Sequence, residues 1–134
     1  MSLGSWDPEA DNAAQNISID AATVERFIGY SRQNQLDQLT DLLGLHESQR
    51  LAGLMQLDHT LWQAAAEALA DDDIVHLIRF FAMAENLPGW EAGDKSPVIA
   101  LARTLRKRGQ RLEKPLLLWL RQVNENRFLP YGPL

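Results

Sequence analysis

Apolar residues recur along most of the chain at intervals of three and four, which is the spacing of one face of an α-helix. Clear early examples lie at residues 24–31 and 34–43, and Gly44 after the second segment is typical of a helix end. Alternating segments rich in β-branched residues, which would indicate strands, do not occur. The pattern predicts an all-α fold, a compact single-domain bundle of about six or seven short helices with an extended C-terminal tail.

Residues that commonly begin helices stand before several of the apolar stripes. Ser18, Asp20, Asp58 and Ser96 are good N-cap residues, and Pro97 suits the first helical position after Ser96. Gly109 then marks the end of the helix that Pro97 begins. These signals predict that the first helix starts after Ser18 or Asp20, and that later helices start near residues 59 and 97.

Other boundaries follow from the same apolar spacing. It predicts one helix over residues 46–56 and a last one that Pro115 opens. In the helix after Asp58, it places Leu61 and Trp62 together on the inner face.

The segment 71–83 is apolar on nearly every side, unlike the amphipathic helices around it. A helix of this kind usually lies at the centre of a bundle, with neighbours all round it. Three aspartates at its start favour the positive end of the helix dipole. We therefore expect Leu77, Ile78 and Phe81 to lie in the core.

The two ends of the chain differ from the helical part. Residues 1–17 lack periodicity and predict a flexible arm, so the helical domain is expected over 18–134. The tail 127–134 contains two prolines and several apolar residues, which excludes a helix and favours packing. It is expected either to fill a groove on its own subunit or to form a homodimer by exchange.

Charge is distributed unevenly along the 134 residues. Residues 1–99 hold five basic and sixteen acidic side chains, a charge of −11, whereas residues 100–134 hold eight and two, a charge of +6, for a net −5. Either the basic end docks on the acidic remainder, or it offers a surface to an acidic partner. The candidate partner-binding residues are Arg103, Arg106, Lys107, Arg108 and Arg111.

Few catalytic chemistries fit the sequence. It has no cysteine, no Gly-x-Ser-x-Gly elbow and no glycine-rich phosphate loop, and no cofactor is expected. The three histidines, His46, His59 and His76, are not spaced as paired metal ligands on a helix, so no metal site is expected. The sequence favours a protein that is not an enzyme.

His76 and Arg79 are the unusual polar residues of the otherwise apolar segment 71–83. His76 is four residues from Asp72 and within its reach. A buried arginine needs a partner, so Arg79 should either lean into solvent or pair with an acid such as Asp72, Asp73 or Glu85.

A more specific hypothesis is that His76 and Arg79 form part of a binding site. It is a small polar pocket beside His76 and Arg79, with Trp90 and Glu91 of the 88–95 loop as its walls. Such a pocket would bind a small molecule or act as an enzyme site.

Residues 97–126 also resemble the outline of a helix-turn-helix, with a break near Gly109. The second helix would read DNA, and its basic side chains suit phosphates. Its first turn is very apolar, however, and the acidic remainder of the chain repels DNA. DNA binding is therefore the alternative to a protein-interaction module.

The leading hypothesis is a non-catalytic interaction or regulatory module that uses the basic C-terminal surface to bind another protein or itself. The longest apolar run, residues 116–120, is far shorter than the roughly 18 residues of a membrane span. The first 14 residues are acidic and polar, which is not typical of a secretory signal. We therefore expect a cytoplasmic protein that does not interact with membranes.

Overall fold

The computed structural model describes residues 17–126 and 129, and within them every regular element is a helix. The α-helices are α2 (Ala21–Arg32), α3 (Leu39–Leu51), α4 (His59–Ala66), α5 (Asp71–Ala84), α6 (Pro97–Lys107) and α7 (Lys114–Val123). Short 3-10 helices are η1 (Leu36–Gln38), η2 (Ala52–Gln56) and η3 (Gly93–Lys95). The predicted all-α class is confirmed.

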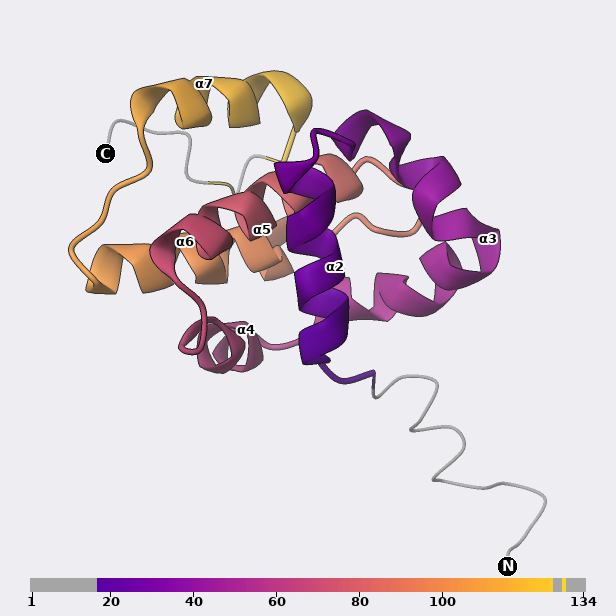
Figure 1. Cartoon of the computed structure of the whole chain (residues 1–134), viewed down its shortest axis with the longest axis horizontal. Helices are drawn as coiled ribbons and strands as arrows, with labels where there is room; N and C mark the ends of the chain where they lie inside the picture. The colour runs from indigo at the N-terminus through magenta and orange to yellow at the C-terminus, as the bar shows by residue number, and fades with distance from the viewer. Residues whose placement is uncertain (1–16, 127–128, 130–134) are drawn as a thin grey trace, which may run out of the picture.

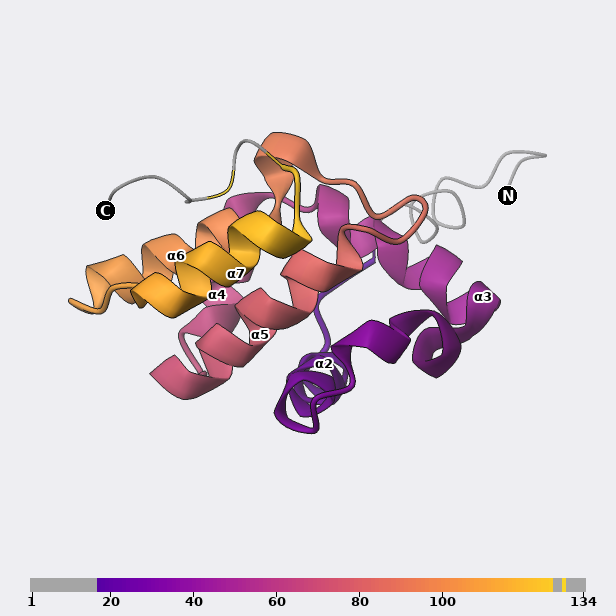
Figure 2. The same ribbon diagram turned by 90° about the horizontal axis from the view of Figure 1, so that it is seen from above.

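Helix α5 lies at the centre of the bundle, as its apolar sequence predicts. In Figure 1, α2 crosses in front of it, α7 lies above and α4 below, and Figure 2 shows α5 between α2 and α6. Its core residues Leu77, Ile78 and Phe81 are at most 1% exposed. Burial on several sides is possible because α2, α6 and α7 all contact this helix.

An aromatic cluster joins α5 to the helices around it. The rings of Phe27 from α2 and Phe80 are stacked with their centres 3.9 Å apart. Trp62 from α4 meets Phe81 edge-on at 4.9 Å, and Trp90 lies 6.3 Å from Phe80. Because offset and edge-on aromatic pairs add to the free energy of burial, these contacts fix how α2 and α4 pack on α5.

The predicted helix starts are confirmed by their caps. The side chain of Asp20 accepts from the backbone N–H of Ala22, and that of Asp58 accepts from Thr60 at 2.9 Å. Ser96 caps α6 by accepting from the backbone N–H two residues later at 3.2 Å. Each cap satisfies an amide that the helix itself leaves without an acceptor.

Two predicted boundaries need correction. The leucine stripe of residues 34–43 forms η1 and the start of α3, and the helical assignment continues across a kink at Gly44, where φ is +75°. A positive φ costs glycine least, so the kink occurs where a helix end was predicted. The expected helix over 46–56 is α-helical only to Leu51 and continues as η2.

The inner face of α4 also differs from the prediction. Leu61, which was expected inside, is 49% exposed, whereas Trp62 and Ala66 are fully buried. The large indole of Trp62 enters the aromatic cluster, and a helix turns by about 100° per residue, so its neighbour Leu61 faces away.

The two ends of the chain are described only in part. Most of the predicted arm lies outside the described residues, but Ile17, its last residue, is partly buried and packs against the core. Of the tail, only Leu129 is described, and it is 5% exposed. Among the described residues, no helix combines the length and apolar character needed to cross a bilayer.

Replacing a leucine by alanine should lower the stability of the protein strongly only where the side chain is buried, as it is in α5. We expect Leu77→Ala to lower the free energy of unfolding by about 2–5 kcal/mol, because it leaves a cavity in the core. Leu118→Ala makes the same change at a side chain that is 51% exposed, and should alter stability by less than about 0.5 kcal/mol. Urea denaturation measures both, and equal losses would contradict a central α5.

Candidate functional site

The structure does not bring the four predicted pocket residues into one pocket. Trp90 is completely buried, and its indole N–H donates to the backbone oxygen of Ser48 at 3.0 Å. Glu91 is exposed and lines a separate small cavity of about 310 Å³. Neither lies with Arg79 in the groove described below. The 88–95 loop therefore does not form walls around His76 and Arg79.

His76 lies between α2 and α5 and contacts a serine that the sequence did not single out as a partner. Its Nδ1 is 2.8 Å from Oγ of Ser31, while its Nε2 is 3.9 Å from a carboxylate oxygen of Asp72. Burial lowers the pKa of His76, and the nearby Asp72 only partly opposes this shift. Burial against α2 therefore favours the neutral form of the imidazole.

Serine, histidine and aspartate are the residue types of a hydrolytic triad, but this arrangement lacks its geometry. Ser31 is only 5% exposed, so its hydroxyl is closed to a substrate. The 3.9 Å between His76 and Asp72 exceeds a hydrogen bond, and Asp72 instead pairs with Arg32 at 2.9 Å. We interpret the Ser31–His76 contact as a link between two helices.

Arg79 takes neither of the two environments that its sequence position suggested. It is partly buried, and its guanidinium carbon lies 4.5 Å from the centre of the Trp119 ring on α7. Among the described residues, no carboxylate forms an ion pair with it, because Asp73 pairs with Arg32 and Glu85 lies in another cluster. A cation–π contact therefore replaces the expected ion pair.

Arg79 and Trp119 line a groove between α5 and α7, which we call the α5–α7 groove. Its volume is about 670 Å³. The apolar part of its lining comes from α5, α6, α7 and the connection between the last two, namely Val75, Leu105, Leu112, Pro115, Leu116 and Trp119. The charged part consists of Arg79, Arg111, Asp71, Asp72 and Glu113.

Four of the five basic candidates form an open surface, which we call the basic edge: Arg103, Arg106, Lys107 and Arg111. All four are exposed, and no carboxylate of the described residues pairs with any of them. The fold therefore does not neutralise this part of the C-terminal charge from within the described chain.

Arg108, the fifth basic candidate, is used inside the fold. Its guanidinium donates to the backbone oxygens of Ala66 and Leu69 and pairs with Asp71, at 2.9, 2.8 and 2.9 Å. Ala66 is the last residue of α4, and Leu69 lies in the connection between α4 and α5. Arg108 thus fastens the end of α6 to the segment between α4 and α5.

The predicted helix-turn-helix is not matched by the arrangement of α6 and α7. The two helices run antiparallel in both views (Figures 1 and 2), whereas the helices of that motif cross at about 90–120°. The first turn of α7 also buries Leu116 in the protein. A helix that uses this turn for packing has less of its surface left to enter a DNA groove.

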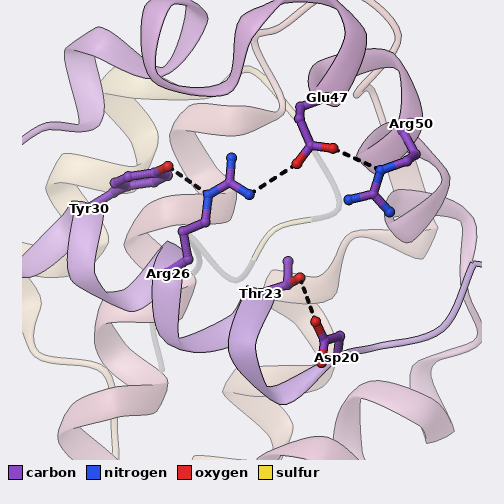
Figure 3. Close-up of polar contacts among 6 residues, drawn as sticks. All are labelled: Asp20, Thr23, Arg26, Tyr30, Glu47 and Arg50. Carbon is purple, nitrogen blue, oxygen red and sulfur yellow. Dashed lines mark hydrogen bonds and ion pairs between the residues drawn. The ribbon is translucent and has the colours of Figure 1, made fainter.

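A second polar network joins α2 to α3 and rims another groove, of about 760 Å³. Figure 3 shows Glu47 between two arginines, Arg26 at 3.1 Å and Arg50 at 2.8 Å. Hydrogen bonds from Arg50 and then Arg26 lower the pKa of Glu47 to about 2. Arg26 also donates to the hydroxyl of Tyr30, so the network holds these surface groups in one arrangement.

A third polar cluster lies at the end of α5 around the buried carboxyl of Glu85, which is 6% exposed. Ser96 donates to one of its oxygens at 2.6 Å and Asn126 to the other at 2.9 Å. Burial raises the pKa of Glu85, although these hydrogen bonds oppose the shift. Asn124 donates to the backbone oxygen of Ala82, so the cluster fastens the segment after α7 to α5.

Neither a metal-ligand cluster nor a similarity to known proteins points to a further site in the described part of the chain. Within the described part of the chain, no group of three or more histidine, aspartate and glutamate side chains is placed to hold a metal ion. Comparisons with protein-family profiles, curated sequences and solved structures found no match. The candidate functional features are therefore the basic edge and the α5–α7 groove.

Glu85 should make stability depend on pH in a definite direction. Because its pKa is raised in the folded protein, folding favours its protonated form, and its contribution to stability declines as pH rises through that pKa. Gln at this position does not titrate. The stability of Glu85→Gln relative to the wild type should therefore increase as the pH is raised from 4 to 8. Urea denaturation across this range tests it, and a constant difference between the two proteins would contradict it.

Arg108 should contribute to stability where its neighbours on the basic edge do not. We expect Arg108→Gln to lower the free energy of unfolding by about 1–2 kcal/mol, because two backbone carbonyls and Asp71 each lose a hydrogen bond from the guanidinium. Arg103→Gln removes the same charge from an exposed position and should change stability by less than about 0.5 kcal/mol. Thermal and urea denaturation compare the two; a similar loss for both would exclude a special role for Arg108.

Proposed function

We propose that the protein is a non-catalytic interaction module whose basic edge binds an acidic segment of a partner protein. The observation that carries this proposal is the exposure of four cationic side chains with no carboxylate partner among the described residues. Arg108, directly beside them, is satisfied by the fold, so the adjacent charges serve no comparable internal contact.

The position of the basic edge favours a protein partner over nucleic acid. Three of its residues lie in the second half of α6 and Arg111 follows the helix, and the whole chain carries a net charge of −5. The acidic remainder repels a long polyanion, whereas a short acidic segment can contact the edge alone. Complementary charge of this kind mainly increases the association rate and makes binding sensitive to salt.

A structural role for the same charges is the competing interpretation. Arg106 and Lys107 lie in the last turn of α6, where a cation stabilises the negative end of the helix dipole by roughly 0.3–1 kcal/mol. This effect would lower the melting temperature of a charge-reversed variant without affecting any ligand. The two interpretations therefore differ in what such a variant loses.

The test uses two identical substitutions at the two ends of α6. Lys107→Glu reverses a charge of the basic edge, and Lys95→Glu reverses an equally exposed charge just before the helix. The probe is a fluorescein-labelled peptide of twelve residues that alternates glutamate with leucine, measured by fluorescence anisotropy at low salt. We expect Lys107→Glu to weaken its binding about tenfold or more, and Lys95→Glu to change it by less than about twofold.

Three outcomes would count against the proposal. These are no binding of the acidic peptide at low salt, equal weakening by both variants, or a lower melting temperature for Lys107→Glu with unchanged binding. The last result would support the helix-dipole role. A DNA duplex that shifts in a gel at micromolar protein, while the peptide does not bind, would instead favour the nucleic-acid alternative.

A further inference from the structure

The α5–α7 groove contains a cation that the proposed interaction surface does not use. Arg79 is partly buried, and the face of its guanidinium is covered by the Trp119 ring at 4.5 Å. The five N–H donors of a guanidinium lie in its plane, so stacking leaves them free to meet an acceptor. Among the described residues, no carboxylate supplies that acceptor.

Two of the three acidic residues of the groove have cations of their own. Asp71 pairs with Arg108 at 2.9 Å, and Asp72 pairs with Arg32 at 2.9 Å. The third acid, Glu113, and the second cation, Arg111, are both exposed and lie in the connection between α6 and α7. Of the two groove cations that form no ion pair among the described residues, Arg79 is therefore the partly buried one.

The rest of the groove suits an apolar body. Val75, Leu105, Leu112 and Leu116 line it together with the Trp119 ring. Its volume of about 670 Å³ lies in the range of cavities that bind small molecules, roughly 300–1,000 Å³. An apolar surface beside a partly buried cation suits a ligand that has both a hydrocarbon body and an anionic group.

We propose that the α5–α7 groove binds a small amphiphilic carboxylate. The carboxylate accepts hydrogen bonds from Arg79, which is held in place by Trp119, and the hydrocarbon body lies against the leucine and valine side chains. A planar guanidinium can bind a carboxylate through two parallel hydrogen bonds, which gives the site both affinity and orientation. Arg111 belongs both to the basic edge and to the lining of the groove, but Arg79 is not part of the basic edge, so this inference does not depend on the proposed protein partner.

The first test compares three ligands of equal chain length on the full-length protein. Decanoate, decanol and decylamine are titrated below their micellar concentrations into the ¹⁵N-labelled protein and followed by amide and indole NMR shifts. We expect decanoate to give saturable shifts at the Trp119 indole and at the amides of Val75 and Leu112. Equal shifts with decylamine, or no saturable shift with decanoate, would overturn the proposal.

The second test asks whether Arg79 is the residue that binds the carboxylate. We expect Arg79→Gln to raise the dissociation constant for decanoate about tenfold or more, because a charge-assisted hydrogen bond is lost. Arg79→Lys keeps the charge without the planar fork and should bind more tightly than Arg79→Gln but less tightly than the wild type. Arg103→Gln loses the same charge outside the groove and should stay within about twofold of the wild type.

Other results would remove the inference. Wild-type affinity in Arg79→Gln would exclude this residue as the carboxylate ligand, and equal weakening by Arg103→Gln would reduce the effect to overall charge. If Arg79→Gln does not fold, the wild-type comparison of decanoate with decylamine still decides, because only a cationic site separates them. Loss of peptide binding in Lys107→Glu with intact decanoate binding would show that the two sites are independent.

Discussion

The constraint on which the structure depends is that α5 has to be covered on almost every side. Its sequence places apolar side chains around most of the circumference of the helix. The transfer of such side chains from water into the core is the main favourable contribution to folding. The helices α2, α6 and α7 all pack on it, and α4 reaches it through the ring of Trp62. The peripheral helices can therefore be amphipathic and short, because each covers one part of the same central helix.

The polar side chains that α5 carries show how a central helix can still hold charge. His76 meets a serine of α2, Arg79 lies against the indole of α7, and Glu85 accepts hydrogen bonds from Ser96 and Asn126. Each of the three contacts a different neighbouring element. The contacts that remove the cost of burying these groups therefore also determine which element lies where along the helix.

Local features of the sequence predict local structure well, and their limits are physical. Asp20, Asp58 and Ser96 begin helices as expected, because an N-cap depends only on residues two or three positions away. Nothing within a turn of Glu47 indicates its partner Arg26, which is 21 positions earlier. Trp90 was expected to form a wall of a pocket beside His76 and Arg79, yet its ring is buried in the core. Contacts between distant segments follow from the packed fold, which a periodic pattern does not specify.

The clasp formed by Arg108 has a consequence for the way the protein opens. It connects the end of α6 to two backbone carbonyls some forty residues earlier in the chain, one at the last residue of α4 and one in the connection to α5. We therefore expect a fluctuation that frees the end of α6 also to release this connection, so that the two segments exchange their amide hydrogens together. The open basic edge is thereby carried on a helix that is tied to α4, which packs beside it.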